Sequence, residues 1–206
     1  MMETNFWLIR HALVEENARA FLYGVMDVAL CEATLLEQAP MYRALAARLP
    51  RGALWFVTPL SRTRRTAETI FAHGYPARPL LVEPGLIEQS LGEWQGLPHA
   101  ELPPRLALPK HAFWPLAGHE KPPGGESMAE VTQRVGAAME RLAADHAGRD
   151  IVIVSHGGAI RGAVAHALAI GPDNALHMSV QNLGLTRLAR VPEGWRVACV
   201  NELPGY

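Results

Sequence analysis

An unbroken run of aliphatic residues, Ile151 to Val154, constrains the fold of this chain more than any other stretch. Because every position is apolar, neither face of a strand built from it can stand in water. The run therefore predicts a central strand of a parallel sheet, covered by helices on both faces. It ends in Ser155 and His156. Ligands of open α/β sheets bind at the carboxyl ends of such strands, which places His156 at a candidate crevice.

Two glycines follow His156, and the segment 159–170 is predicted to form a helix. Glycine lets backbone N–H groups approach a ligand closely, and the positive end of a helix favours an anion. We therefore expect Gly157 to contact the ligand beside His156.

The same pattern occurs near the N-terminus, where the apolar run Phe6 to Ile9 is followed at once by Arg10 and His11. One histidine at a strand end is weak evidence, since such residues are often structural. If the two strands are neighbours, however, His11 and His156 face each other across a pocket that already carries the Arg10 guanidinium. The pair with its arginine indicates a functional site.

Composition favours one domain and excludes several partners. The 206 residues are 49% hydrophobic, enough to bury the core of a single α/β domain spanning residues 1–206. The formal net charge is −1. No global field therefore favours nucleic acid or a membrane surface, and an anion site must be local. Oligomeric state is open at this level, a homodimer included.

Cys31 and Cys199 make no disulfide framework and have no metal-ligand spacing, which suits a reducing cytosol. The N-terminus has no secretory signal pattern, and no apolar stretch approaches the roughly 20 residues of a membrane span. We expect a cytoplasmic protein without cofactor or metal.

The remaining patterns predict strands at 53–57 and 78–82 and a C-terminal hairpin over 185–200. A helix over 61–74 follows the first of these strands, and Ser127 with Glu130 forms a capping box for another. Thr34 with Glu37 resembles a further capping box. Pro40 conflicts with a straight helix there, which predicts a kink or a helix that begins near Pro40.

Arginines crowd the start of the helix predicted at 61–74, at Arg62, Arg64 and Arg65. Cations are disfavoured at a helix N-terminus, so an anion is expected opposite. Arg62 is closest to the strand end and is predicted to point into the pocket, whereas Arg64 and Arg65 are interpreted as solvated. Three carboxylates of the following loop, Glu83, Glu88 and Glu93, are equally well placed to complete the site.

The segment 97–123 is unusually rich in proline and carries His99, His111 and His119. Proline at this density excludes a sheet strand or a long helix. We interpret the segment as an insertion forming a lid that selects substrate, with a passive surface loop as the alternative. No two of these histidines have the i, i+4 spacing of a helical metal site, so a metal is not expected.

Two histidines, two arginines and one carboxylate suit phosphoryl transfer. Guanidinium groups can hold phosphate oxygens bidentately, and a neutral imidazole is a competent nucleophile. The second histidine, protonated, would donate to a phosphate oxygen, and a carboxylic acid would protonate the leaving alkoxide. The sequence contains no G-x-x-x-x-G-K-[ST], G-x-S-x-G or H-E-x-x-H motif, which disfavours nucleotide-driven or metal-dependent chemistry.

Five ordered segments resemble the motifs of the histidine phosphatase superfamily, which includes the cofactor-dependent phosphoglycerate mutases. LIRHALVEEN resembles R-H-G-x-T-x-x-N, and TPLSRTRRTAETI resembles S-x-L-x-R-x-x-x-T-A. LIEQSLGEWQG, PPGGES and IVIVSHGGAIR are similar to the later motifs. The resemblance implies a three-layer α/β/α fold of the phosphoglycerate mutase type, with a mostly parallel central sheet.

By this resemblance, His11 is the nucleophile that becomes phosphohistidine, and His156 is the second pocket histidine. Glu88 takes the acidic position of the family and is the implied proton donor. The remaining roles are a phosphate clamp and substrate contacts, which fall to Arg10, Arg62, Asn17, Tyr23 and Gly24.

The resemblance implies a phosphomonoesterase acting on a small phosphate ester. A phosphoglycerate mutase, which is an isomerase, is the first alternative, but the chain resembles the compact phosphatases more closely. The chain departs from the motif at two positions, where Ala12 replaces glycine and Val14 replaces threonine. If residue 12 requires a positive φ, alanine strains the backbone, which leaves a non-catalytic phosphate-binding protein as the second alternative.

Overall fold

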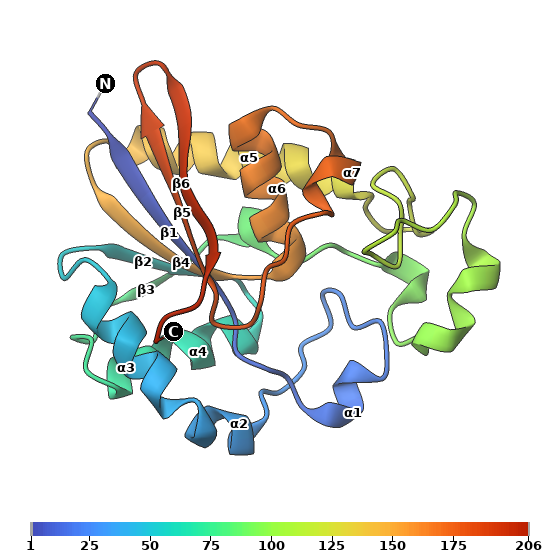
Figure 1. Cartoon of the computed structure of the whole chain (residues 1–206), viewed down its shortest axis with the longest axis horizontal. Coiled ribbons are helices and arrows are strands. Elements are labelled where there is room, and N and C mark those ends of the chain that lie inside the picture. Colours follow the sequence, from blue (N-terminus) through green and yellow to red (C-terminus); the bar gives the residue numbers. More distant parts are fainter. Residues whose placement is uncertain (1, 206) are drawn as a thin grey trace.

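The computed structural model describes residues 2–205, which contain one six-stranded sheet in the order β3-β2-β4-β1-β5-β6 (Figure 1). Strands β3, β2, β4 and β1 run parallel, and β5 and β6 add an antiparallel edge. The strands are β1 (Thr4–Arg10), β2 (Leu54–Val57), β3 (Leu80–Val82), β4 (Asp150–Ser155), β5 (Leu185–Val191) and β6 (Gly194–Glu202). The predicted central strand and the mostly parallel sheet are confirmed.

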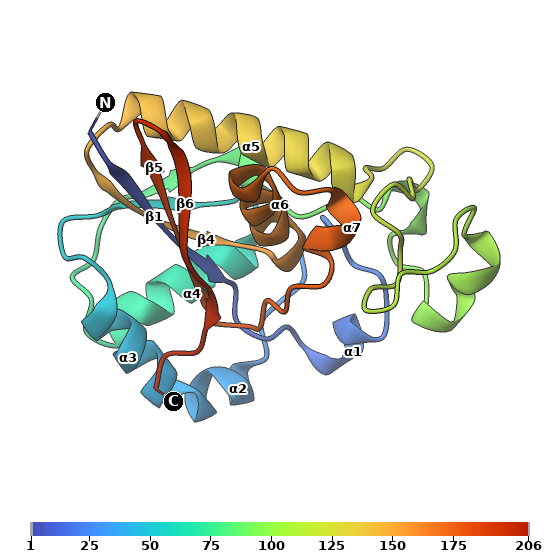
Figure 2. The ribbon, with the colours of Figure 1, turned by 45° about the horizontal axis from the view of Figure 1, so that its top comes forward.

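Helices cover both faces of the sheet, with α5 and α6 on one face and α3 and α4 on the other (Figure 2). This three-layer arrangement confirms the expected α/β/α fold. The helices are α1 (Glu16–Arg19), α2 (Glu32–Glu37), α3 (Ala39–Arg48), α4 (Ser61–Ala72), α5 (Met128–Asp145), α6 (Gly157–Leu168) and α7 (Pro172–Ala175). Single 3₁₀ turns are η1 (Pro84–Leu86), η2 (Gly92–Trp94), η3 (His99–Glu101) and η4 (Pro103–Arg105).

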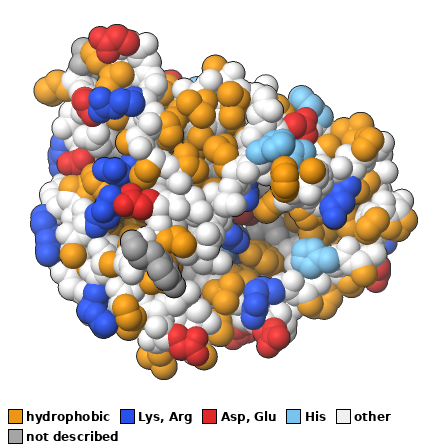
Figure 3. Space-filling view, in the orientation of Figure 1, with side chains coloured by type: hydrophobic (Ala, Val, Ile, Leu, Met, Phe, Trp, Pro, Cys, Tyr) orange, Lys and Arg blue, Asp and Glu red, His pale blue; other side chains and the backbone are white. Residues whose placement is uncertain are grey.

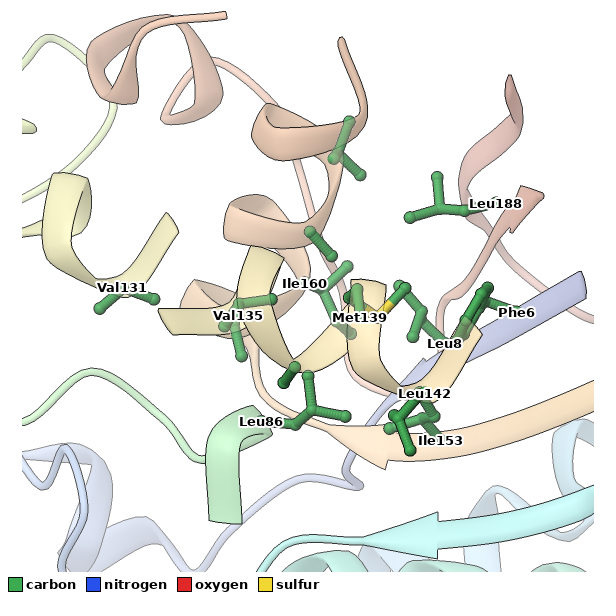
Figure 4. Packing of buried hydrophobic residues seen from close by; sticks show 14 of the residues in the cluster. Phe6, Leu8, Leu86, Val131, Val135, Met139, Leu142, Ile153, Ile160 and Leu188 are labelled. Atoms are coloured by element: carbon green, nitrogen blue, oxygen red, sulfur yellow. The ribbon is translucent and has the colours of Figure 1, made fainter. Parts of the chain in front are cut away.

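The side chains of β4 alternate between two hydrophobic cores. Ile151 and Ile153 pack under α5 and α6, where Figure 4 shows Ile153 among side chains from both the sheet and the helices. Val152 and Val154 face α3 and α4. All four residues are fully buried, which explains why the run contains no polar position.

The predicted starts of α4 and α5 are correct, whereas α6 begins at Gly157, two residues before the predicted helix. The capping box of Ser127 and Glu130 is present at the start of α5, and α3 begins at Ala39, so that Pro40 lies in its first turn. The capping box expected of Thr34 and Glu37 is wrong. Helix α2 begins at Glu32 with Cys31 as its N-cap, three residues before Thr34, and the Thr34 hydroxyl donates to the Cys31 Sγ instead.

The proline-rich segment 97–123 contains only the turns η3 and η4 as regular structure, and it forms the lobe at the right of Figure 1. Leu102 and Leu116 anchor it in a small apolar cluster with Leu22, Leu91 and Trp94. Within residues 2–205, no helix has both the length and the apolar character required to cross a membrane.

Candidate active site

The pairing of β1 with β4 brings the two strand-end histidines together. Arg10 lies opposite Ser155 in the register, so the next residues, His11 and His156, emerge side by side. The His11 N–H continues the pairing to the Ser155 carbonyl oxygen at 2.9 Å. The two imidazole ring centres are 5.2 Å apart, and both side chains are at most 1% exposed. The predicted juxtaposition of the histidines is present.

The hydrogen bond of His11 fixes its tautomer. The His11 Nδ1 lies 2.7 Å from the carbonyl oxygen of Ala12, which can only accept, so Nδ1 carries the proton and Nε2 the lone pair. Burial, reinforced by the charges of Arg62 and Arg10, holds the pKa of His11 well below its usual value. At neutral pH His11 is therefore a neutral imidazole with its Nε2 lone pair available, the form that a nucleophile requires.

His156 is held by a hydroxyl group, with its Nε2 2.9 Å from the Oγ1 of Thr58. Burial, followed by the nearby His11, Arg62 and Arg10, lowers the pKa of His156 well below its usual value. This lowered pKa favours the neutral form of His156, in contrast to the protonated form expected from the sequence. The Thr58 hydroxyl can donate to Nε2, which leaves the proton on Nδ1 and makes neutral His156 a donor through that atom.

Two predicted arginines adjoin the histidines. Arg62, in the first turn of α4, is fully buried and donates to the carbonyl oxygens of Met26 and Gly24, each at 2.7 Å. Gly24 has a φ of +40°, a conformation that favours glycine and aims its carbonyl at Arg62. Arg10 donates to the carbonyl oxygen of Val180 at 2.6 Å. Both guanidiniums are thus fixed in place by backbone carbonyls, and no carboxylate within residues 2–205 is hydrogen-bonded to either.

A third arginine, Arg161, reaches the same site, and sequence reasoning missed it. Its Nε donates to the carbonyl oxygen of Met178 at 2.9 Å, and its guanidinium lies 4.3 Å from the ring centre of Trp114. Burial lowers the pKa of Arg161 to about 10, which still leaves it charged at neutral pH. Its spacing of four residues from Gly157 places both on one face of α6, the signal that could have identified it.

Unsatisfied donors and acceptors concentrate at this site. Of the eight buried side-chain polar atoms without a hydrogen-bond partner in residues 2–205, five are nitrogens of the residues just described. Burying so many polar groups without partners is costly, so a ligand with several acceptor oxygens is expected among them. The five atoms are Arg10 Nε, His11 Nε2, Arg62 Nε, His156 Nδ1 and Arg161 Nη1.

The start of α6 brings these groups and Glu88 close together. A Cβ on Gly157 would lie 3.2 Å from Arg161 Nη1 and 3.5 Å from Arg10 Nε. A Cβ on Gly158 would collide with Glu88 Oε1. The N–H of Gly158 donates to Glu88 Oε2 at 3.3 Å, and the Gln89 N–H donates to Oε1 at 2.9 Å. The carboxylate is thus oriented by two backbone N–H groups beside the cluster of arginines.

The structure distinguishes among the three candidate carboxylates. Glu88 lines a cavity of about 350 Å³ together with Arg10 and Gly157. Glu83 instead accepts a hydrogen bond from Arg141 at 2.6 Å, and Glu93 is exposed. The geometry agrees with the residue chosen by family resemblance.

The remaining substrate-contact predictions have mixed outcomes. Tyr23 and Gly24 line the same cavity, and the Tyr23 ring centre is 5.4 Å from the Arg62 guanidinium carbon. Asn17 is not brought to the site. It lies exposed on α1, and its Oδ1 accepts a hydrogen bond from the neighbouring Ala18 N–H at 2.7 Å. Arg64 and Arg65 are exposed, as expected of solvated residues.

The two departures from the family motif are accommodated without strain. Among the described residues, the non-glycine positions with positive φ are Ala169, Leu183 and Asn201, so Ala12 has an ordinary backbone conformation. The N–H of Ala12 donates to the Thr66 hydroxyl at 3.0 Å. Val14 is buried and lines the cavity. The backbone strain at residue 12 that would favour a non-catalytic pocket is therefore absent.

The two buried histidines should make stability depend on pH. Their folded-state pKa values lie below the unfolded value of about 6.5, so below that pH the unfolded chain binds protons that the folded protein does not. The stabilisation is complete above about pH 6.5 and is lost on acidification. Each histidine contributes up to about 1.4 kcal/mol per pH unit to the fall in the free energy of unfolding.

Urea unfolding of the protein at several values between pH 5 and 8 measures this slope. The variant His11→Ala should lose part of it, and His119→Ala, which removes an exposed histidine, should retain it. A slope unchanged by His11→Ala would contradict the assignment of a neutral, buried His11.

Comparison with known proteins is consistent with this geometry. The family model of the histidine phosphatase superfamily (branch 1) matches residues 6–203. The chain is 31% identical over 180 residues to glucosyl-3-phosphoglycerate phosphatase of Mycolicibacterium vanbaalenii, covering 81% of this chain and 75% of that protein. It is 27% identical over 175 residues to a 2,3-bisphosphoglycerate-dependent phosphoglycerate mutase of Cytophaga hutchinsonii, covering 84% of this chain and 81% of that protein.

Solved structures resemble the whole chain. A mycobacterial glucosyl-3-phosphoglycerate phosphatase superposes with a TM-score of 0.77 at 25% identity, covering 97% of this chain and 99% of that one. The α-ribazole phosphatase of Shigella flexneri has the same fold, with a TM-score of 0.78 at 23% identity and 96% coverage of both chains. The fold, the paired histidines and the family match lead to one conclusion: the chain belongs to branch 1 of the histidine phosphatase superfamily.

Proposed function

We propose that the protein is a phosphomonoesterase that hydrolyses a small phosphate ester through a phosphohistidine formed on His11. The observation that carries the proposal is the group of five buried nitrogens without partners, which includes the lone-pair nitrogen of a neutral His11. A phosphate monoester carries close to two negative charges and several acceptor oxygens. Three guanidiniums and the His156 Nδ1 match both the charge and the number of acceptors.

In the first step, His11 Nε2 attacks phosphorus in line with the ester oxygen, forming a P–N bond as the P–O bond breaks. Arg10, Arg62 and Arg161 balance the charge on the phosphoryl oxygens as the transition state forms. Glu88, in its protonated form, donates its proton to the departing alkoxide, which leaves as a neutral alcohol. This role follows from the position of its carboxyl at the cavity, beside the start of α6.

In the second step, Glu88, now a carboxylate, accepts a proton from water, and the water oxygen attacks phosphorus. The P–N bond breaks, its electron pair returns to His11 Nε2, and inorganic phosphate leaves. The net reaction consumes one water and yields one alcohol and one phosphate, so the enzyme regains its starting state. The three arginines can neutralise the phosphate themselves, and we propose that the reaction needs no added metal.

Some relatives are named as phosphatases and others as mutases. The alternative to hydrolysis is therefore a mutase reaction, in which the phosphohistidine returns its phosphoryl group to a substrate.

The segment 97–123 acts as a lid in this proposal, since it contributes His99, Trp114 and Leu116 to the cavity. We place the reaction in the cytoplasm, in keeping with the free thiols of Cys31 and Cys199.

Two measurements, of phosphate release and of phosphoglycerate interconversion, distinguish a phosphatase from a mutase. The protein, treated with EDTA, is incubated with p-nitrophenyl phosphate in ¹⁸O-labelled water between pH 5 and 8. We expect steady phosphate release with one solvent oxygen incorporated per phosphate, and no stimulation by 2,3-bisphosphoglycerate. Interconversion of 2- and 3-phosphoglycerate that depends on this primer, with negligible phosphate release, would favour the mutase. Dependence on an added divalent metal would contradict the proposed role of the arginines.

A further inference from the structure

The cavity that opens from the phosphate-binding groups has apolar walls. Figure 3 shows a hollow between the main body and the right-hand lobe, with hydrophobic side chains around it. Arg10, Gly157 and Glu88 form its phosphate end. The volume of about 350 Å³ is within the range of pockets that enclose small organic ligands. Its hydrophobic lining includes Val14, Leu22, Tyr23, Leu91, Trp114 and Leu116.

These walls are held by the surrounding structure. Leu22, Leu91 and Leu116 belong to the apolar cluster that anchors the segment 97–123 and are all at most 8% exposed. Trp114 is fixed at its ring face by the Arg161 guanidinium. A preformed apolar wall of this kind gains binding free energy only from an apolar group placed against it.

The side-chain nitrogens of Gln89 and Asn182, the two amide residues of the lining, already donate to backbone carbonyl groups. The Gln89 side-chain nitrogen donates to the carbonyl oxygen of Glu126 at 2.7 Å. The Asn182 side-chain nitrogen donates to the carbonyl oxygen of His11, also at 2.7 Å. A polyhydroxylated leaving group would bury hydroxyls against leucine and tryptophan, which is costly when they lack partners.

Val14 adds to the apolar character of the cavity. The family motif has threonine at this position, whereas this chain presents a buried valine to the cavity. The basic residues of the lining other than Arg10 are Arg19 and His99, both exposed. An exposed guanidinium adds little binding free energy for a carboxylate, because water screens it.

We infer that the substrate is the phosphate monoester of an apolar alcohol, with an alkyl chain or aromatic ring lying against Trp114, Leu91 and Leu116. The inference rests on the proposed function, since it names the alcohol that this phosphatase releases. It separates this chain from a phosphatase for sugar phosphates or phosphorylated hydroxy acids, whose leaving groups carry hydroxyls or a carboxylate.

The test compares primary alkyl phosphates, whose leaving alcohols have similar acidity, so that only the fit of the alcohol varies. We expect kcat/KM to rise roughly threefold per methylene group from ethyl to pentyl phosphate. Glycerol 3-phosphate, which has as many non-hydrogen atoms as pentyl phosphate, should be at least about tenfold poorer. Equal or better turnover of glycerol 3-phosphate or 3-phosphoglycerate would overturn the inference while leaving the phosphatase intact.

Binding of alkylphosphonates tests the apolar cavity independently of whether the protein is a phosphatase. Alkylphosphonates cannot be hydrolysed, so calorimetric titration with methyl-, propyl- and pentylphosphonate measures the cavity alone. Affinity that rises with chain length, in a protein that hydrolyses no ester, would overturn the phosphatase and support the apolar pocket. Affinity independent of chain length would overturn the apolar pocket.

Two adjacent residues provide matched variants. Trp114 lines the cavity, whereas Phe113 is 67% exposed and is not part of the lining. Trp114→Gln should lower the ratio of kcat/KM for pentyl phosphate over glycerol 3-phosphate by roughly five- to tenfold. Phe113→Gln should leave that ratio unchanged. Val14→Thr, a nearly isosteric change, should lower the ratio in the same direction, and an unchanged ratio in both cavity variants would overturn the inference.

Discussion

Replacing His11 by alanine should lower kcat for phosphate release by at least about 10⁴-fold. Its Nε2 is the buried nitrogen with an available lone pair, because Nδ1 donates to the Ala12 carbonyl oxygen. The arginines can still bind phosphate, but without His11 no P–N bond forms. Steady-state phosphate release from p-nitrophenyl phosphate measures the loss.

Loss of the nucleophile must be distinguished from loss of the fold or of phosphate binding. Rapid quenching of the wild-type protein with labelled substrate should trap an acid-labile phosphohistidine that the variant lacks. His119→Ala removes an exposed histidine of the segment 97–123 and should retain full activity. Circular dichroism and calorimetric titration with inorganic phosphate establish that His11→Ala is folded and still binds the anion. A folded His11→Ala protein with more than a few per cent of the activity would exclude His11 as the nucleophile.

The parts of the site that lie on strands could be predicted from sequence. Ile151 to Val154 and Phe6 to Ile9 are short buried runs, and parallel strands end at the same edge of a sheet. The residues that follow, His156 and Arg10 with His11, were therefore expected at the same edge of the sheet, and the pairing of β1 with β4 brings them together. Strand periodicity thus predicts the shared edge, whereas the adjacency of the two strands is given only by the folded structure.

The parts contributed by loops could not be derived in this way. Glu83, Glu88 and Glu93 share one glycine-rich loop, and Glu88 is distinguished only in the folded structure, by its place at the cavity and its contact with the Gly158 N–H. Sequence spacing carries no information about a contact between residues 70 positions apart. Asn17 is the opposite case, a residue predicted to contact substrate that the structure does not bring to the site. It lies exposed on the short helix α1.

Arg161 and Trp114 illustrate a third case, in which the position of each side chain depends on a contact with the other segment. Arg161 could have been found from its helical spacing to Gly157, yet an arginine on a helix is ordinarily a surface residue. It is buried here because Trp114 covers its guanidinium and the Met178 carbonyl accepts its Nε–H. The proline-rich segment predicted as a lid therefore also covers one arginine of the proposed phosphate site.

Replacing Gly158 by alanine should lower kcat for alkyl phosphates by on the order of 10²- to 10⁴-fold, the contribution expected of a general acid. The new Cβ would collide with Glu88 Oε1 and displace the carboxyl from the leaving oxygen. The loss should be smaller for p-nitrophenyl phosphate, whose leaving group is a weak base and needs little protonation. Steady-state kinetics on both substrates test this difference.

Gly162 provides the control within the same helix. A Cβ at Gly162 would meet the nearest Thr132 atoms at 3.4 and 3.5 Å, close to ordinary contact, so Gly162→Ala should retain activity. Alanine also has the higher helix propensity, so the helix itself should not be destabilised in Gly158→Ala. In a Glu88→Gln background, Gly158→Ala should cause little further loss, because both changes remove the same proton donor. Full activity of Gly158→Ala, or additive losses in the double variant, would assign leaving-group protonation to another residue.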